Sequence, residues 1–156
     1  MSTADDLIAL IPIKDPARGK SRLASILSQD ERHALNVFLA RRTLGICIAC
    51  FGKDRTLVVT ASNAVAGMAA AAGVQVVPEE ERDAGLNAAL VTAADCASAA
   101  GAGAILVVPT DLAFLSEPDL RAAAAAIPAS PGCLIVPDRR NTGTNLLGLR
   151  PVKSEL

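Results

Sequence analysis

Short apolar runs alternate along this chain with longer segments in which alanine and leucine recur at helical spacing. Several of the apolar runs show no alternation of polar and apolar positions, which is typical of strands covered on both faces of a sheet. The most apolar runs are also rich in β-branched residues. The predicted strands are 7–13, 56–60, 74–77, 104–109, 133–137 and 146–149.

Three of the four predicted helices begin at serine caps. Ser28 and Glu31 form an S-x-x-E capping box, and Gly73 is expected to end the second helix. The predicted helices start after Ser28, after Ser62, near Leu86 and after Ser116. This order of strands and helices predicts an α/β fold with a mainly parallel sheet and helices on both faces. The 156 residues fit one domain.

The composition of the chain argues against two classes of partner, nucleic acids and membranes. Aromatic residues make up 2% of the chain and the net charge is −1. Base stacking and a basic field are therefore both lacking, which argues against a nucleic-acid partner. No apolar stretch reaches the length of a membrane span and no secretory signal is present, so we expect no membrane partner and a cytoplasmic location.

The four cysteines do not form a recognisable metal or redox motif. Cys47 and Cys50 make one C-x-x-C, but a zinc ribbon needs two such pairs, and only one histidine is present. A thioredoxin-type pair lies at the start of a helix, whereas this one lies at the end of a helical pattern. The thiols are interpreted as small buried hydrophobic groups.

Ligands of parallel sheets bind at the carboxyl ends of the strands, so the residues after each strand are candidates. "KDPARGKSRL" follows the first strand and contains four cations that can wrap a phosphate. Its Gly-Lys-Ser triplet matches the end of a P-loop, but Lys14 stands where the first glycine of that motif belongs. We interpret it as a phosphate loop of another kind; a solvated basic loop is the alternative. The cations are Lys14, Arg18, Lys20 and Arg22.

Two further segments offer three candidates between them. Gly85 could let a ligand approach the backbone and Asn87 offers a donor and an acceptor, although such residues are also common at helix starts. Asp111 follows the run 104–109. Its carboxylate could hold Mg²⁺ against substrate phosphates or could bond its own backbone in a turn.

The segment 138–145 is a run of polar residues and one glycine between two strands. A plain hairpin connection would need far fewer residues. Hydroxyl groups, amides and a glycine suit a loop that hydrogen-bonds a phosphate or a carboxylate. We therefore favour a ligand loop over a simple connection.

Taken in order, four blocks of the sequence resemble one family. They are "IPIKDPARGKSRLASILSQDERHAL", "GLNAAL", "PTDLAFLSEPDL" and "PDRRNTGTNLL". They resemble the 2-phospho-L-lactate guanylyltransferases of coenzyme F420 biosynthesis, whose close relatives accept phosphoenolpyruvate or 3-phosphoglycerate. The resemblance implies a Rossmann-like three-layer nucleotidyltransferase fold, shared with molybdenum-cofactor guanylyltransferases. It also implies Mg²⁺-dependent transfer of GMP from GTP to a phosphorylated three-carbon acid, with release of diphosphate.

The resemblance assigns roles residue by residue. Because the nucleophile is a phosphate oxygen that is already ionised, His33 needs no catalytic duty. Lys20 and Asp111 are the expected catalytic residues, with Asp111 as the metal ligand. The expected nucleotide contacts are Lys14, Arg18, Lys20, Ser21, Arg22, Gly85 and Asn87, and the expected acceptor contacts are Asp138, Thr144 and Asn145.

The family pattern continues beyond the segment that matches 146–149, with F-G-x-x-S-x-x-x-H and a later acidic stretch. This chain ends at Leu156. We therefore expect a domain without the family's C-terminal segment, an uncovered sheet edge, and self-association or low stability. A related nucleotidyltransferase with another acceptor and a non-catalytic nucleotide-binding protein remain alternatives. The sequence leaves open the acid acceptor and the choice of GTP over other triphosphates.

Overall fold

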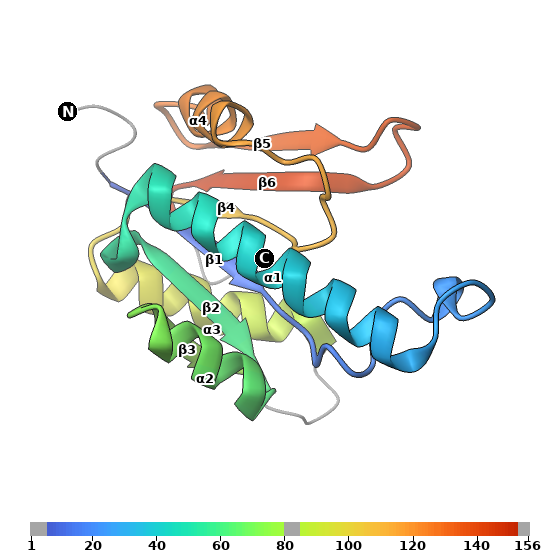
Figure 1. The fold of residues 1–156 in the computed structure, drawn as a ribbon. Coiled ribbons are helices and arrows are strands. Elements are labelled where there is room, and N and C mark those ends of the chain that lie inside the picture. The colour runs from blue at the N-terminus through green and yellow to red at the C-terminus, as the bar shows by residue number, and fades with distance from the viewer. Residues whose placement is uncertain (1–5, 80–84, 153–156) are drawn as a thin grey trace.

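The computed structural model describes residues 6–79 and 85–152, without the side chains of 85–87. Strands and helices alternate along the chain as predicted (Figure 1). The strands are β1 (Leu7–Pro12), β2 (Thr56–Thr60), β3 (Gln75–Pro78), β4 (Ala104–Val107), β5 (Gly132–Pro137) and β6 (Thr144–Arg150). The helices are α1 (Gln29–Phe51), α2 (Asn63–Ala71), α3 (Gly85–Ala99) and α4 (Glu117–Ala126), with short 3-10 turns η1 (Ser21–Leu23) and η2 (Lys53–Arg55).

The strands form one sheet in the order β3-β2-β1-β4-β6-β5. β1 pairs in parallel with β2 and β4, and β2 with β3, whereas β6 is antiparallel to both of its neighbours. Side chains of α1, α2 and α4 pack on one face, and α3 packs on the other (Figure 1). The prediction of a mainly parallel three-layer α/β fold is confirmed.

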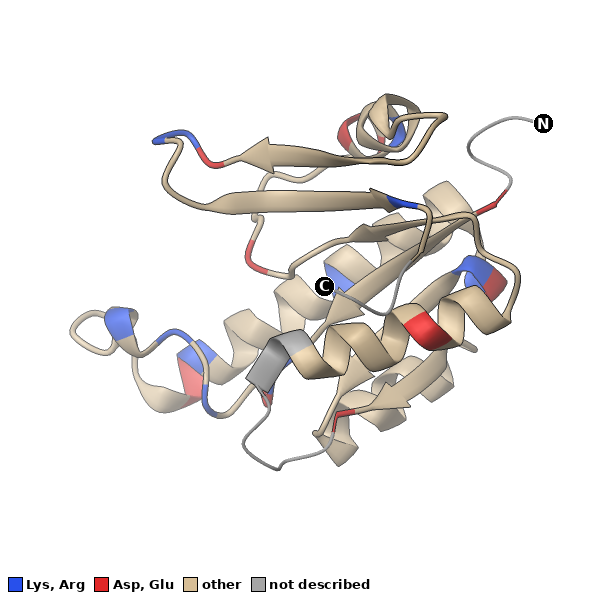
Figure 2. Cartoon of the chain, turned by 180° about the vertical axis from the view of Figure 1, so that it is seen from behind, with Lys and Arg blue, Asp and Glu red and all other residues tan. Residues whose placement is uncertain are grey.

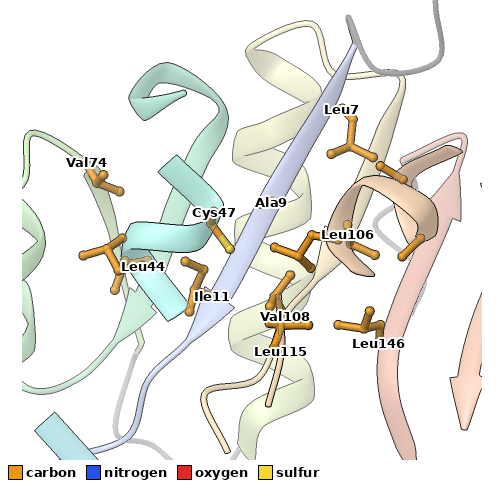
Figure 3. Packing of buried hydrophobic residues seen from close by; sticks show 14 of the residues in the cluster. Leu7, Ala9, Ile11, Leu44, Cys47, Val74, Leu106, Val108, Leu115 and Leu146 are labelled. Carbon is orange, nitrogen blue, oxygen red and sulfur yellow. The ribbon is translucent and has the colours of Figure 1, made fainter. Parts of the chain in front are cut away.

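The alternation of side chains along β1 explains why both faces are apolar. Leu7, Ala9 and Ile11 lie in the core beneath α1 and α4 (Figure 3). Ile8 and Leu10 belong to the second core, which is closed by the buried alanines of α3. Because successive strand residues point to opposite faces, a central strand must be apolar at every position.

The helix signals are largely confirmed. Ser28 and Ser116 both form complete capping boxes, in which the serine hydroxyl accepts from the N3 backbone N–H. Gly73, with φ 74°, stands at the C′ position, directly after the C-cap Ala72, as expected. Ser62 stands at the N-cap of α2, but the prediction that its side chain caps the helix is wrong. Its backbone N–H instead donates to the Thr60 hydroxyl over 3.1 Å.

The segment after β5 differs from expectation. β5 and β6 form an antiparallel hairpin, so Thr144 and Asn145 are the first residues of a strand rather than part of a loop. β5 is an outer strand of the described sheet, and Ile135 is 56% exposed. This agrees with the expected uncovered edge and apolar surface. Cys47 is buried as expected, but Cys133 on β5 is exposed, so the interpretation of all four thiols as buried is wrong.

The first helix is long and apolar enough to cross a membrane by length and composition, although none was expected from the sequence. Its buried residues, which include Leu39, Leu44 and Cys47, pack against the sheet. A helix of a folded α/β layer passes the same test, so this finding is weak support for a membrane span.

Candidate active site

The basic loop between β1 and α1 is anchored by two polar side chains. The amide of Asn36, on α1, donates to the Pro16 carbonyl over 2.8 Å. One oxygen of Asp15 accepts from a backbone N–H two residues further on, over 3.0 Å. A Cβ atom on Gly19 would lie 2.6 Å from the Asn36 amide nitrogen, so the loop approaches the helix closely there. Lys20 adopts a left-handed backbone with φ 59°.

A hollow of about 310 Å³ lies between this loop and the end of β4, and is called here the β4-side hollow. Lys14, Lys20 and Asp111 all line it. The loop after β1 and the loop after β4 meet because β1 and β4 are parallel neighbours in the sheet. The fold thus brings together three of the predicted site residues. Figure 2 shows basic segments along the loop that follows β1.

A second hollow of about 460 Å³, the β3-side hollow, lies on the other side of the same loop. Lys14 and Asp15 line both hollows and form the wall between them. Arg18 also lines this one, as predicted for a nucleotide contact, together with Ser62 and Glu79, which the sequence analysis missed. Both missed residues follow strands, so the carboxyl-end rule applied to β2 and β3 would have found them.

A third hollow of about 720 Å³, the α4-side hollow, is lined by α4 and the β5–β6 hairpin and is mostly apolar. Asp111 and Asn145 both line it. Because Asp111 also lines the β4-side hollow, its carboxylate stands where the predicted nucleotide and acceptor residues adjoin.

The carboxylate of Asp138 organises its own loop. It accepts from the backbone N–H groups of Arg140 and Thr142, each over 2.9 Å, and from the Thr142 hydroxyl over 3.2 Å. The hydrogen bond from the Thr142 N–H holds the pKa of Asp138 below its ordinary value. Neither Asp138 nor the exposed Thr144 lines any of the three hollows. Their roles as acceptor contacts stay predictions.

Of the other predicted nucleotide contacts, the two in η1 are not brought into these hollows. Ser21 and Arg22 lie in η1 with exposed side chains and line none of the three. Gly85 and Asn87 lie in the first turn of α3, but their side chains fall outside the described residues.

The residues present fit a magnesium ion held mainly by its substrate. Within the described ranges no group of three or more His, Cys, Asp or Glu side chains gathers as a metal site. Mg²⁺, however, is typically bound by one or two carboxylates plus phosphate oxygens. Asp111 is exposed, and among described residues its carboxylate has no hydrogen bond or ion pair. The alternative that Asp111 bonds its own backbone in a turn is therefore not observed.

Comparison with known proteins decides the family. The model of the guanylyl transferase CofC-like family matches residues 7–156. The chain belongs to this family. The resemblance drawn from the four sequence blocks is confirmed, and with it the nucleotidyltransferase class of enzyme.

Two curated relatives and one solved structure illustrate the match. A phosphoenolpyruvate guanylyltransferase of Rubrobacter xylanophilus is 34% identical over 93% of this chain and 69% of its own length. One from Salinispora arenicola is 37% identical over 91% of this chain and 65% of its own length. A cytidylyltransferase from Leptospira borgpetersenii has a TM-score of 0.63 at 13% identity, covering 93% of this chain and 60% of that one. The chain thus spans about two thirds of the CofC-like relatives' length, and the nucleotidyltransferase fold is confirmed.

Proposed function

We propose that this protein transfers GMP from GTP to a phosphorylated three-carbon acid, releasing diphosphate, as a step of coenzyme F420 biosynthesis. The acid is 2-phospho-L-lactate, phosphoenolpyruvate or 3-phosphoglycerate. The observation that carries the proposal is the meeting of Lys14, Lys20 and Asp111 in one hollow at the carboxyl ends of β1 and β4. The phosphoenolpyruvate guanylyltransferases among the relatives support the choice of acceptor class.

The reaction requires the protein mainly to neutralise charge and to position the two reactants. A phosphate oxygen of the acid attacks the α-phosphorus of GTP, and the bond to the oxygen that bridges to the β-phosphate breaks. Diphosphate leaves with the electron pair. The attacking oxygen is already ionised, so no general base is required. Lys14 and Lys20 neutralise the charge of the triphosphate and of the leaving diphosphate.

Magnesium completes the charge balance in this proposal. Asp111 is the residue that would hold the ion, which when bound would supply positive charge that neutralises the phosphates. Asn145 and the α4-side hollow lie beside Asp111. We therefore assign the acceptor to this side and the nucleotide to the side of Lys14, Arg18 and Lys20.

The test is release of diphosphate from GTP and Mg²⁺ with each of the three acids. We expect release with one of them, and none with water as the only acceptor. Lys20→Ala is expected to slow the reaction by about 10²- to 10³-fold, the usual effect of removing one charge-stabilising donor. Asp111→Ala is expected to abolish the Mg²⁺-dependent release.

Asp54→Ala is the matched control for Asp111→Ala. Asp54 is exposed in η2, which precedes β2, and therefore lies at the amino end of that strand, whereas Asp111 follows the carboxyl end of β4. This substitution also removes one aspartate carboxylate, but at a position that lines none of the hollows, so activity should be retained. Absence of diphosphate release with all three acids would contradict the proposed function.

The remaining properties rest on the composition of the chain and on the exposed outer strand of the sheet. We propose a cytoplasmic enzyme whose partners are GTP and the phosphorylated acid, without nucleic acid or membrane, and which forms a homo-oligomer. The exposed apolar side of β5 at Ile135 supports self-association.

A further inference from the structure

We propose that Glu79 selects guanine, because its carboxylate accepts hydrogen bonds from the base's N1–H and 2-amino groups in the β3-side hollow. This inference rests on the proposed guanylyltransferase function and names the residue that distinguishes GTP from other triphosphates. Three observations carry it: the fixed position of Glu79, its unused carboxylate, and the division of the site into two hollows.

The sheet fixes the position of Glu79. It follows β3 directly, and its backbone N–H donates to the carbonyl of Thr60, at the end of β2, over 3.0 Å. Its side chain is half-buried and lines the β3-side hollow. The backbone bond does not involve the side chain, so a substitution at this position leaves the pairing of β2 with β3 unchanged.

The Glu79 carboxylate has no partner within the described part of the chain. No hydrogen bond or ion pair of its side chain is formed with any described residue. Asp15, the other acid among the described residues that line the hollow, does have partners. One of its oxygens accepts from a backbone N–H within its loop, and the other lies 3.9 Å from Nε of Arg18. Among the described acids that line this hollow, Glu79 is therefore the one whose carboxylate is available to a ligand.

The division of the site places the base on the side of Glu79. Lys20 and Asp111 lie in the β4-side hollow and take the phosphates, and Lys14 belongs to the wall shared by both hollows. A nucleotide whose phosphates lie there extends past this wall into the β3-side hollow. At about 460 Å³, that hollow is within the range of about 300–1,000 Å³ typical of small-molecule sites. Ser62 also lines this hollow, and its hydroxyl does not cap α2. The hydroxyl can therefore hydrogen-bond the sugar or the base.

A carboxylate in this place favours guanine on chemical grounds. An ionised carboxylate is an acceptor only, with two oxygens side by side. Guanine offers two adjacent donors, N1–H and the 2-amino group, which match those oxygens. Adenine offers an acceptor at N1, whose lone pair faces the carboxylate and is repelled. Hypoxanthine keeps N1–H and lacks the 2-amino group, so it can make only one of the two bonds.

The experiment measures the binding of GTP, ITP and ATP to the whole protein with Mg²⁺ by calorimetry. Wild-type protein should bind GTP more tightly than ITP by about 10- to 100-fold, the worth of one hydrogen bond to a charged group. In Glu79→Gln, GTP should bind about 10- to 100-fold more weakly, and the GTP-to-ITP ratio should fall toward one. ATP binding should not weaken, because the repulsion of its N1 is removed.

Glu117→Gln is the matched control. Glu117 begins α4, is exposed and lines none of the three hollows, so the same loss of one charge should leave all three affinities unchanged. Melting temperatures of both variants check folding.

The outcomes separate the inference from the proposed function. A wild-type protein that binds none of the three triphosphates would overturn the proposed function and, with it, the inference. A wild-type protein that binds GTP, with an unchanged GTP-to-ITP ratio in Glu79→Gln, would overturn the inference alone. Equal weakening of all three nucleotides would also overturn it, because Glu79 would then act on the loop or the phosphates rather than on the base.

Discussion

Replacing Gly19 by alanine tests whether the basic loop between β1 and α1 depends on its contact with α1. The new Cβ would lie 2.6 Å from the Asn36 amide nitrogen, a distance at which something must move. The atom it meets is the end of a side chain, which can turn away. Turning away breaks the 2.8 Å bond to the Pro16 carbonyl. The substitution should therefore lower the free energy of unfolding by no more than that hydrogen bond contributes, about 1 kcal/mol.

For a chain of this size, such a loss lowers the melting temperature by roughly 2–4 °C. GTP binding should weaken as well, because the released loop carries Lys14 and Lys20. Urea denaturation and calorimetric titration with GTP measure the two effects. Gly67→Ala is the control: a Cβ there has nothing within 4 Å, and the position is helical, so alanine should be neutral or stabilising by up to about 1 kcal/mol.

A double-mutant cycle tests whether Gly19 and Asn36 act together. Asn36→Ala removes both the bond and the obstructing amide, so it should cost about as much as Gly19→Ala. Adding Gly19→Ala to Asn36→Ala should then cost almost nothing further. Costs that simply add would show that the two positions act independently, and the account of the loop anchor would be wrong.

Three other predictions concern the scaffold. Gly148→Ala should destabilise by about 1–3 kcal/mol in urea denaturation, because its Cβ would lie 2.7 Å from an isoleucine side chain after α4. Asp6 accepts from Arg150 over 2.7 and 2.8 Å, which lowers its pKa below 3.8. Asp6→Asn should therefore lower the melting temperature at pH 7, and the difference from wild type should shrink as pH falls below about 3.8 toward the folded-state pKa. Iodoacetamide at pH 8 should label exposed Cys133 but not Cys47, whose burial raises its pKa to about 12, as mass spectrometry of the peptides can check.

The predictable part of this molecule is the part set by local pattern. Apolar runs without alternation indicated central strands, and the capping box at Ser28 marked the start of α1 to the residue. The meeting of Lys14 with Asp111 also followed from one rule, since both stand after parallel strands. These features need only the neighbouring sequence and the general geometry of parallel sheets.

The features that escaped prediction depend on contacts between distant segments or on a competing local bond. Asn36 anchors a loop twenty residues earlier in the chain, and nothing in its own helix pattern distinguishes it. The sequence pattern did not indicate that both oxygens of Asp138 accept hydrogen bonds within its own turn, and its role as an acceptor contact stays a prediction. The strand predicted over 146–149 begins two residues earlier in β6, because polar Thr144 and Asn145 gave no apolar signal, and its antiparallel direction depends on pairing with other strands.

The difference from a P-loop also has a physical explanation. A P-loop places phosphate on the N-terminus of the helix that follows it, where backbone N–H groups and the helix dipole attract anions. Here α1 begins only at Gln29, and the backbone N–H groups of Ser28 and Glu31 are engaged by their capping box. Asp30 and Glu31 in the first turn further repel an anion. In the proposed function, Lys14 and Lys20 supply through side chains what a P-loop supplies through its backbone, so binding of the triphosphate should weaken markedly as salt screens them.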